Sequence, residues 1–136
     1  MSEVKSRELP ITSELSFAVA LDEFETAKNL LDASSETSIV RASGVVARVA
    51  LDRHLFTVAE SRQIPIEKHP PSKAKADVAD VLNTLKKRDV LTAIQKSELE
   101  SLFTIGNYCA HPKETVRASD VQRLIQRGKE LASVIL

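Results

Sequence analysis

The residue types best suited to chemistry gather in one short stretch, residues 106–111, with the sequence GNYCAH. If this stretch is helical, Asn107 and His111 are four residues apart and project from the same face. An amide and an imidazole in that arrangement can share one ligand, for instance a phosphate oxygen and a nearby hydroxyl. Histidine can also exchange a proton near neutral pH. Asn107 and His111 are therefore the candidate catalytic residues.

The same spacing also has a purely structural explanation. A histidine at a helix C-terminus, just before Pro112, can interact with the last carbonyl groups and the negative end of the helix dipole. Asn107 can make a local hydrogen bond. Spacing alone does not choose between chemistry and structure, because no paired catalytic signature accompanies these two residues.

Five amphipathic segments would position this stretch, and no convincing strand is present. Apolar residues recur in them at three- and four-residue steps, which is typical of helices buried on one face. The second segment is apolar on more than one side, so several neighbours must cover it. Its Gly44 either permits a close helix approach or marks a local irregularity. The expected helices are residues 12–31, 35–62, 73–87, 92–111 and 119–136.

Local signals mark where these helices begin and end. Prolines 65, 70 and 71 make residues 63–72 the clearest loop. Thr12 or Ser13 can cap the first helix, and two pairs have capping-box spacing: Thr92 with Gln95, and Ser119 with Gln122. Short connections between the later helices favour antiparallel neighbours. The prediction is an all-α, up-and-down bundle of about five helices.

Length and composition set the remaining bounds. The chain has 136 residues, with 19 basic and 19 acidic side chains, and fits one domain. We expect an N-terminal tail over residues 1–11 and a helical domain over residues 12–136. Cys109 is the only cysteine, and neither a metal-ligand set nor a cofactor fingerprint is visible, so no metal or cofactor is expected. No stretch approaches the ~20 apolar residues of a membrane span, which predicts a cytoplasmic protein.

The motif and the elements around it resemble the HEPN superfamily. The likeness is strongest to a branch whose fourth-helix motif reads GN-x-x-A-H and which often accompanies bacterial defence and restriction systems. Gly106, Asn107, Ala110 and His111 match that motif. A long preceding helix with Arg41 to Leu55 and a closing amphipathic helix after Ser119 support the likeness, which covers about residues 12–136.

The resemblance implies a helical bundle that forms a homodimer with the motif helices near the two-fold axis. In the nuclease members, an Arg-x-x-x-x-His motif from each subunit builds a metal-independent RNA-cleaving site, in which the arginine holds the scissile phosphate. Here Gly106 stands five residues before His111, where that arginine is expected. Loss of a bidentate phosphate ligand should weaken transition-state stabilisation severely.

Other residues could supply RNA contacts or a substitute guanidinium. Tyr108 could stack on a base. Arg123 and Arg127 share a face at the i, i+4 spacing, although a solvated basic face is the simpler explanation. The predicted RNA-binding residues are Tyr108, Lys113, Arg117, Arg123 and Arg127.

The functional prediction is a dimerising module that binds RNA or a partner protein, with a degenerate ribonuclease motif. The resemblance places it in a prokaryotic defence, toxin–antitoxin or stress system. Two alternatives stay open: an active metal-independent endoribonuclease using His111 and Asn107, and an antitoxin-like subunit that binds protein only. No membrane association is expected.

Overall fold

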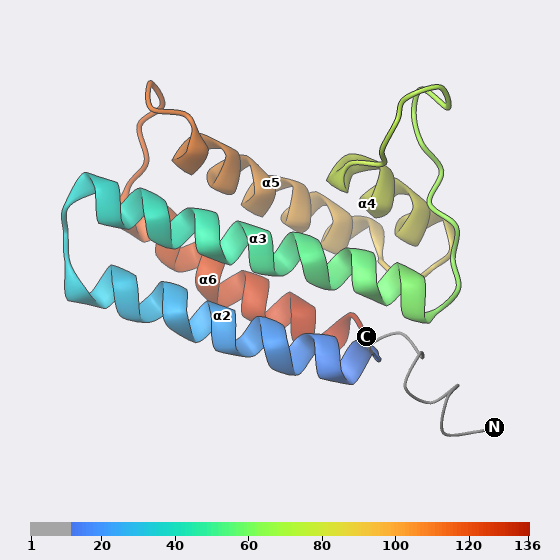
Figure 1. Cartoon of the computed structure of the whole chain (residues 1–136), viewed down its shortest axis with the longest axis horizontal. Helices are drawn as coiled ribbons and strands as arrows, with labels where there is room; N and C mark the ends of the chain where they lie inside the picture. The colour runs from blue at the N-terminus through green and yellow to red at the C-terminus, as the bar shows by residue number, and fades with distance from the viewer. Residues whose placement is uncertain (1–11) are drawn as a thin grey trace.

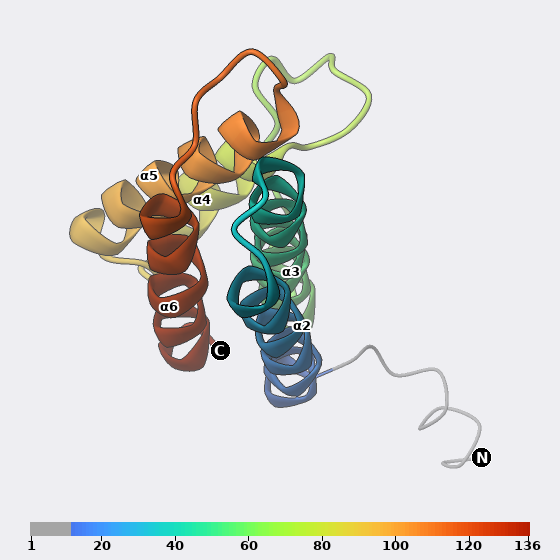
Figure 2. The same cartoon turned by 90° about the vertical axis from the view of Figure 1, so that its left-hand side faces the viewer.

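The computed structural model describes residues 12–136, which form five α-helices. They are α2 (Ser13–Ala33), α3 (Thr37–Ser61), α4 (Val78–Lys87), α5 (Ala93–Ala110) and α6 (Ala118–Val134). In Figure 1, α3 runs across the front of the molecule between α2 and α5. Figure 2 shows α6 on the other side of the bundle, against α2 and α5. The predicted all-α bundle is confirmed, and the predicted tail over residues 1–11 lies outside the described residues.

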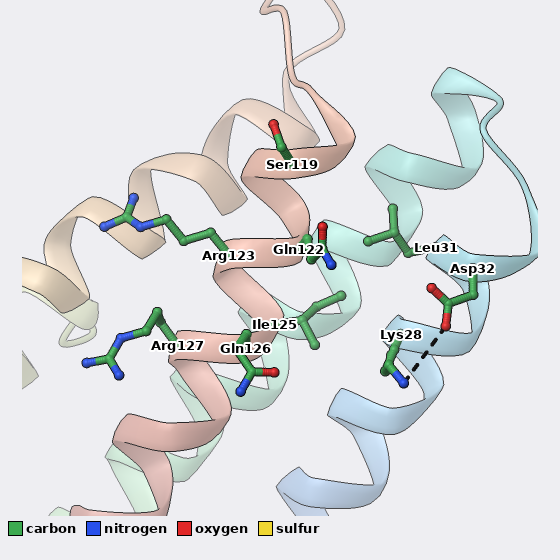
Figure 3. Close-up of a pocket in the computed structure, with 9 residues that line it drawn as sticks. All are labelled: Lys28, Leu31, Asp32, Ser119, Gln122, Arg123, Ile125, Gln126 and Arg127. Atoms are coloured by element: carbon green, nitrogen blue, oxygen red, sulfur yellow. Dashed lines mark ion pairs between the residues drawn. The ribbon is translucent and has the colours of Figure 1, made fainter.

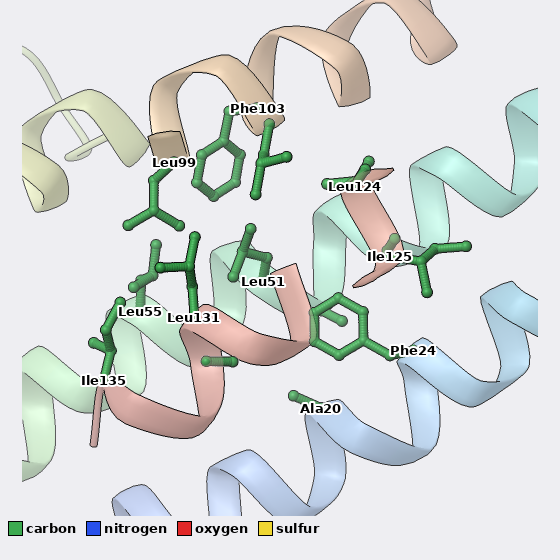
Figure 4. Close-up of a cluster of buried hydrophobic side chains, with 14 of the residues drawn as sticks. Ala20, Phe24, Leu51, Leu55, Leu99, Phe103, Leu124, Ile125, Leu131 and Ile135 are labelled. Atoms are coloured by element: carbon green, nitrogen blue, oxygen red, sulfur yellow. The ribbon is translucent and has the colours of Figure 1, made fainter. Parts of the chain in front are cut away.

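The core lies between α3 and α6 and is closed by α2 on one side and α5 on the other (Figure 4). α3 contacts all four other helices, as its apolar character on several sides predicts. Burial of each large apolar side chain contributes roughly 1.5–3 kcal/mol to folding. The largest fully buried side chains include Phe24, Leu51, Leu55, Leu99, Leu102 and Leu124.

Two of the predicted helix starts are confirmed by their capping contacts. The Thr12 hydroxyl accepts a hydrogen bond from the Leu15 amide at the start of α2. Thr92 and Gln95 form the predicted reciprocal capping box at the start of α5. Each cap satisfies amide groups that the first turn of a helix leaves without partners.

The predicted start of α4 and the predicted capping box of α6 are wrong. α4 begins at Val78 rather than residue 73, because Asp77 and Asp80 form a capping box there. The ammonium group of Lys73 lies 2.7 Å from the Asp80 carboxylate, and this hydrogen bond lowers the pKa of Asp80 to about 2. α6 begins at Ala118, before the predicted Ser119–Gln122 box. There the Asp120 carboxylate accepts the amide hydrogen of the preceding Arg117 instead.

A close antiparallel crossing of α3 and α5 positions the end of α5. A Cβ atom built on Gly44 would lie 2.2 Å from the Cys109 sulfur, so the thiol fills the space that this glycine leaves. A Cβ atom on Gly106 would lie 2.6 Å from the Cγ and Cδ atoms of Arg48. Each helix therefore contributes one glycine to the contact. Of the two explanations for Gly44, the structure supports the close approach of helices.

Candidate functional site at the end of α5

The GNYCAH stretch spans the end of α5 rather than one continuous helical face. Asn107 is helical, but α5 ends at Ala110, and His111 has an extended backbone with φ −104° and ψ 112°. The predicted i, i+4 pair is therefore wrong in its geometry. The cause is Pro112, whose ring disfavours helical angles in the residue before it.

Asn107 and His111 nevertheless line one hollow of about 560 Å³. Tyr108 and Lys113, two of the predicted RNA-binding residues, line it as well. Tyr108 is 43% exposed, and the other three side chains are also exposed. The structure thus brings four of the seven predicted site residues together in one open depression.

Arg41 of α3 secures the chain end at this hollow. Its guanidinium donates to the carbonyl oxygens of Tyr108 (2.7 Å), Cys109 (3.3 Å) and His111 (2.8 Å). It also donates to the Glu114 carbonyl. These oxygens include the free carbonyls at the negative end of the helix, which a cation stabilises. Arg41, rather than His111, therefore caps α5.

A second arginine of α3, Arg48, also reaches the motif. One terminal nitrogen of its guanidinium donates to the Asn107 side-chain oxygen over 3.2 Å. We expected neither Arg41 nor Arg48 at the site from the sequence. The available signal was their place on the helix that carries Gly44, which runs antiparallel to α5.

The three predicted arginines that precede or lie within α6 do not line the hollow. Arg117 precedes the helix and is exposed. Arg127 forms two hydrogen bonds with Glu98, and Arg123 donates to Ser101. Ser101 and Glu98 precede His111 by ten and thirteen residues, about 15 and 20 Å along the chain at helical rise.

The Arg123–Arg127 pair is therefore occupied alongside the first half of α5. Figure 3 shows both side chains projecting from one side of α6, away from Lys28 and Asp32 of α2. They border a separate hollow of about 420 Å³ between α2 and α6. This placement corrects the hypothesis that the pair supplies a guanidinium beside His111.

Cys109 and His54 are both structural in this fold. Burial raises the pKa of the Cys109 thiol, which makes it a poor nucleophile. His54 is 1% exposed. Its Nε2 donates to the Ile135 carbonyl (2.7 Å), and its Nδ1 accepts from the Ser16 hydroxyl (2.9 Å). Burial lowers the pKa of His54, so the ring is held neutral between α2 and the chain end.

Within residues 12–136, no group of three or more His, Cys, Asp or Glu side chains is placed to hold a metal ion. None of the helices in this part of the chain has the length and apolar character that crossing a bilayer requires. The chain matches no family model, no curated protein and no solved structure. The likeness to HEPN proteins therefore stays a prediction from the motif residues.

Proposed function

We propose that this chain is a HEPN-like module that binds single-stranded RNA at the hollow beside Asn107 and His111 and acts as a homodimer. The observation that carries the proposal is the convergence of Asn107, Tyr108, His111 and Lys113 on one open hollow. These side chains provide an amide, an aromatic ring, an imidazole and an ammonium group. The prokaryotic defence or stress context is inferred from the motif alone.

The electrostatics of the hollow support a polyanionic ligand. A bare helix C-terminus repels anions, because its carbonyl oxygens carry partial negative charge. Here the Arg41 guanidinium covers these oxygens, and Lys113 adds a second cation to the wall. Glu114 is the only carboxylate among the lining residues. An RNA backbone can therefore approach the C-terminus of α5 without meeting its uncompensated partial negative charge.

The outer face of α3 supports the dimer. Residues 42, 45, 49, 52 and 56 follow one another in steps of three and four, which is the spacing of a coiled-coil seam. We call this set the α3 seam: Ala42, Val45, Val49, Asp52 and Phe56. Val49 at its centre is 40% exposed. Across an antiparallel two-fold axis at Val49, the small Ala42 of one copy would face the large Phe56 of the other.

RNA binding is tested with a fluorescent single-stranded RNA and purified protein at low salt, with chelator present. We expect binding that weakens as salt rises, because phosphate contacts release counterions. His111→Ala and Lys113→Ala should weaken it. His69→Ala is the matched control, since His69 is also exposed but lies in the loop before α4.

The same assay separates the alternatives. RNA cleavage that survives chelator and disappears in His111→Ala would replace the binding module with a metal-independent endoribonuclease. Failure of the wild-type protein to retain RNA at low salt would contradict RNA binding and favour a subunit that binds protein only.

The dimer is tested by light scattering at high micromolar concentration. Val49→Glu places a charge at the centre of the α3 seam and should convert the dimer to a monomer. Ile94→Glu is the control, because Ile94 is 81% exposed at the start of α5 and lies outside the seam. A monomeric wild type, or a dimer that tolerates Val49→Glu, would contradict the proposed interface.

A further inference from the structure

Arg48 is held beside Asn107, at the edge of the motif, because Gly106 has no side chain. The Cβ, Cγ and Cδ atoms of Arg48 lie where a Cβ atom on Gly106 would clash, at 2.6–2.7 Å. Its aliphatic stem therefore rests directly on the α5 backbone. This contact sets the direction of the side chain and brings the guanidinium to the residue after the glycine, Asn107.

The hydrogen bond between Arg48 and Asn107 determines how the Asn107 amide is oriented. A guanidinium has donors and no acceptor, so it must face the amide oxygen of Asn107. The NH₂ group of Asn107 is then directed elsewhere, and it makes no hydrogen bond within residues 12–136. Because Asn107 lines the hollow, its two N–H donors are available there to a ligand that accepts hydrogen bonds.

Arg48 also contributes positive charge, and no carboxylate in the described part of the chain lies at ion-pair distance from it. Asp52, one turn along α3, is near enough to feel this charge: burial raises the pKa of Asp52, and Arg48 opposes that shift. The Nε atom of Arg48 is buried without a hydrogen-bond partner among the described residues. Leaving a charged donor without an acceptor is unfavourable. An anion near the Asn107 amide would therefore meet a guanidinium whose hydrogen-bonding capacity is only partly used.

We propose that the hollow binds a phosphodiester group of single-stranded RNA, with the Asn107 NH₂ group as hydrogen-bond donor and Arg48 as the charged residue that orients it. The inference rests on the proposed function and assigns its ligand chemistry. Gly106 then has a positive role: it makes room for a guanidinium that comes from α3 instead of from its own position.

The first test uses the wild-type protein and inorganic phosphate, followed by nuclear magnetic resonance. The Asn107 side-chain NH₂ and the Arg48 Nε–H give separate ¹H–¹⁵N signals, which Asn107→Ala and Arg48→Lys assign by their disappearance. Phosphate should shift both signals in a saturable way. Sulfate, with similar geometry, is a second probe, and chloride at equal ionic strength is the control.

The second test measures RNA affinity and its salt dependence in Arg48→Gln, which keeps a polar side chain but removes the charge. Loss of a charge-assisted contact should weaken RNA binding about 10-fold or more. The slope of log affinity against log salt should fall by about 0.7, the value for one phosphate contact on a single strand. Arg48→Lys should recover part of the affinity.

Arg53→Gln is the matched control, because Arg53 lies on the same helix and pairs with Glu23 away from the motif. Circular dichroism establishes that each variant is folded. If folded Arg48→Gln keeps the wild-type affinity and salt slope while His111→Ala still weakens RNA binding, the Arg48 assignment is overturned and the proposed function stands. Phosphate shifts without RNA binding would retain the phosphate site and refute RNA as its ligand. Neither RNA binding nor phosphate shifts would refute both.

Discussion

The contact between Gly44 and Cys109 makes a quantitative prediction about the crossing that positions the site. Gly44→Ala introduces a methyl group whose carbon would lie 2.2 Å from the Cys109 sulfur. Overpacking of this kind is destabilising by about 1–3 kcal/mol. Alanine improves helix propensity over glycine by about 1 kcal/mol, so the single substitution should lower the free energy of unfolding by about 1 kcal/mol.

The second substitution, Cys109→Ala, removes the sulfur and leaves a small void beside Gly44. It should also lower the free energy of unfolding by about 1 kcal/mol, comparable to the loss of one buried methylene and some cavity. In the double variant the new methyl group occupies the space of the sulfur. The two losses then cancel, and the double variant should be about as stable as the wild type.

The double-mutant cycle is measured by urea unfolding, followed by circular dichroism. We expect a coupling free energy of about 2 kcal/mol in favour of the double variant. For a domain of this size, each single variant should melt about 4 °C below the wild type. Additivity within about 0.5 kcal/mol would refute the direct contact, because residues that do not touch behave independently.

Four further substitutions test contacts around the site and in the core. Arg41→Gln should speed amide hydrogen exchange in residues 108–114 while leaving α6 protected, and unchanged exchange would contradict the capping role. In the wild type, stability should fall as pH drops below ~6.5, because unfolded His54 then takes up a proton that the folded state resists. In His54→Gln the urea midpoint should depend less on pH between about 6.5 and 5 than it does in the wild type. An unchanged pH dependence would refute this role of His54. Gly106→Arg should unfold more readily than the wild type without gaining RNA cleavage. Adding Arg48→Ala should restore part of its stability, because the Cγ and Cδ contacts are removed while the Cβ contact at 2.7 Å remains.

The fold could be predicted because its determinants are local. Apolar residues at helical spacing identify five segments, and the Thr92–Gln95 box marks the start of α5 correctly. The boundary errors come from competition between equally plausible caps. Asp77 and Asp80 cap α4 in place of residues further upstream, and Lys73 is drawn to Asp80 in the loop instead of continuing the helix. Such choices depend on contacts across the loop, which spacing does not reveal.

The site was predicted only where its residues are neighbours in the sequence. Asn107, Tyr108, His111 and Lys113 meet at one hollow because they follow one another around the end of α5. Arg41 and Arg48 precede them by about sixty residues and arrive through the antiparallel packing of α3. Arg123 and Arg127 are closer in sequence, but α6 carries them to Ser101 and Glu98. Helix register, rather than proximity in sequence, decides which cations reach the motif.

This register also changes the meaning of Gly106. Considered within the motif alone, Gly106 means that the phosphate-binding arginine of the nuclease pattern is missing, because glycine has no side chain. In the packed bundle the same position is filled by the stem of Arg48, and an arginine at 106 would compete with Arg48 for that space. A guanidinium at this end of α5 can therefore come from residue 106 or from Arg48, but the crossing distance does not accommodate both. The Arg48–Asn107 contact therefore requires glycine at position 106, and the proposed RNA binding requires that this pair can bind a phosphodiester group.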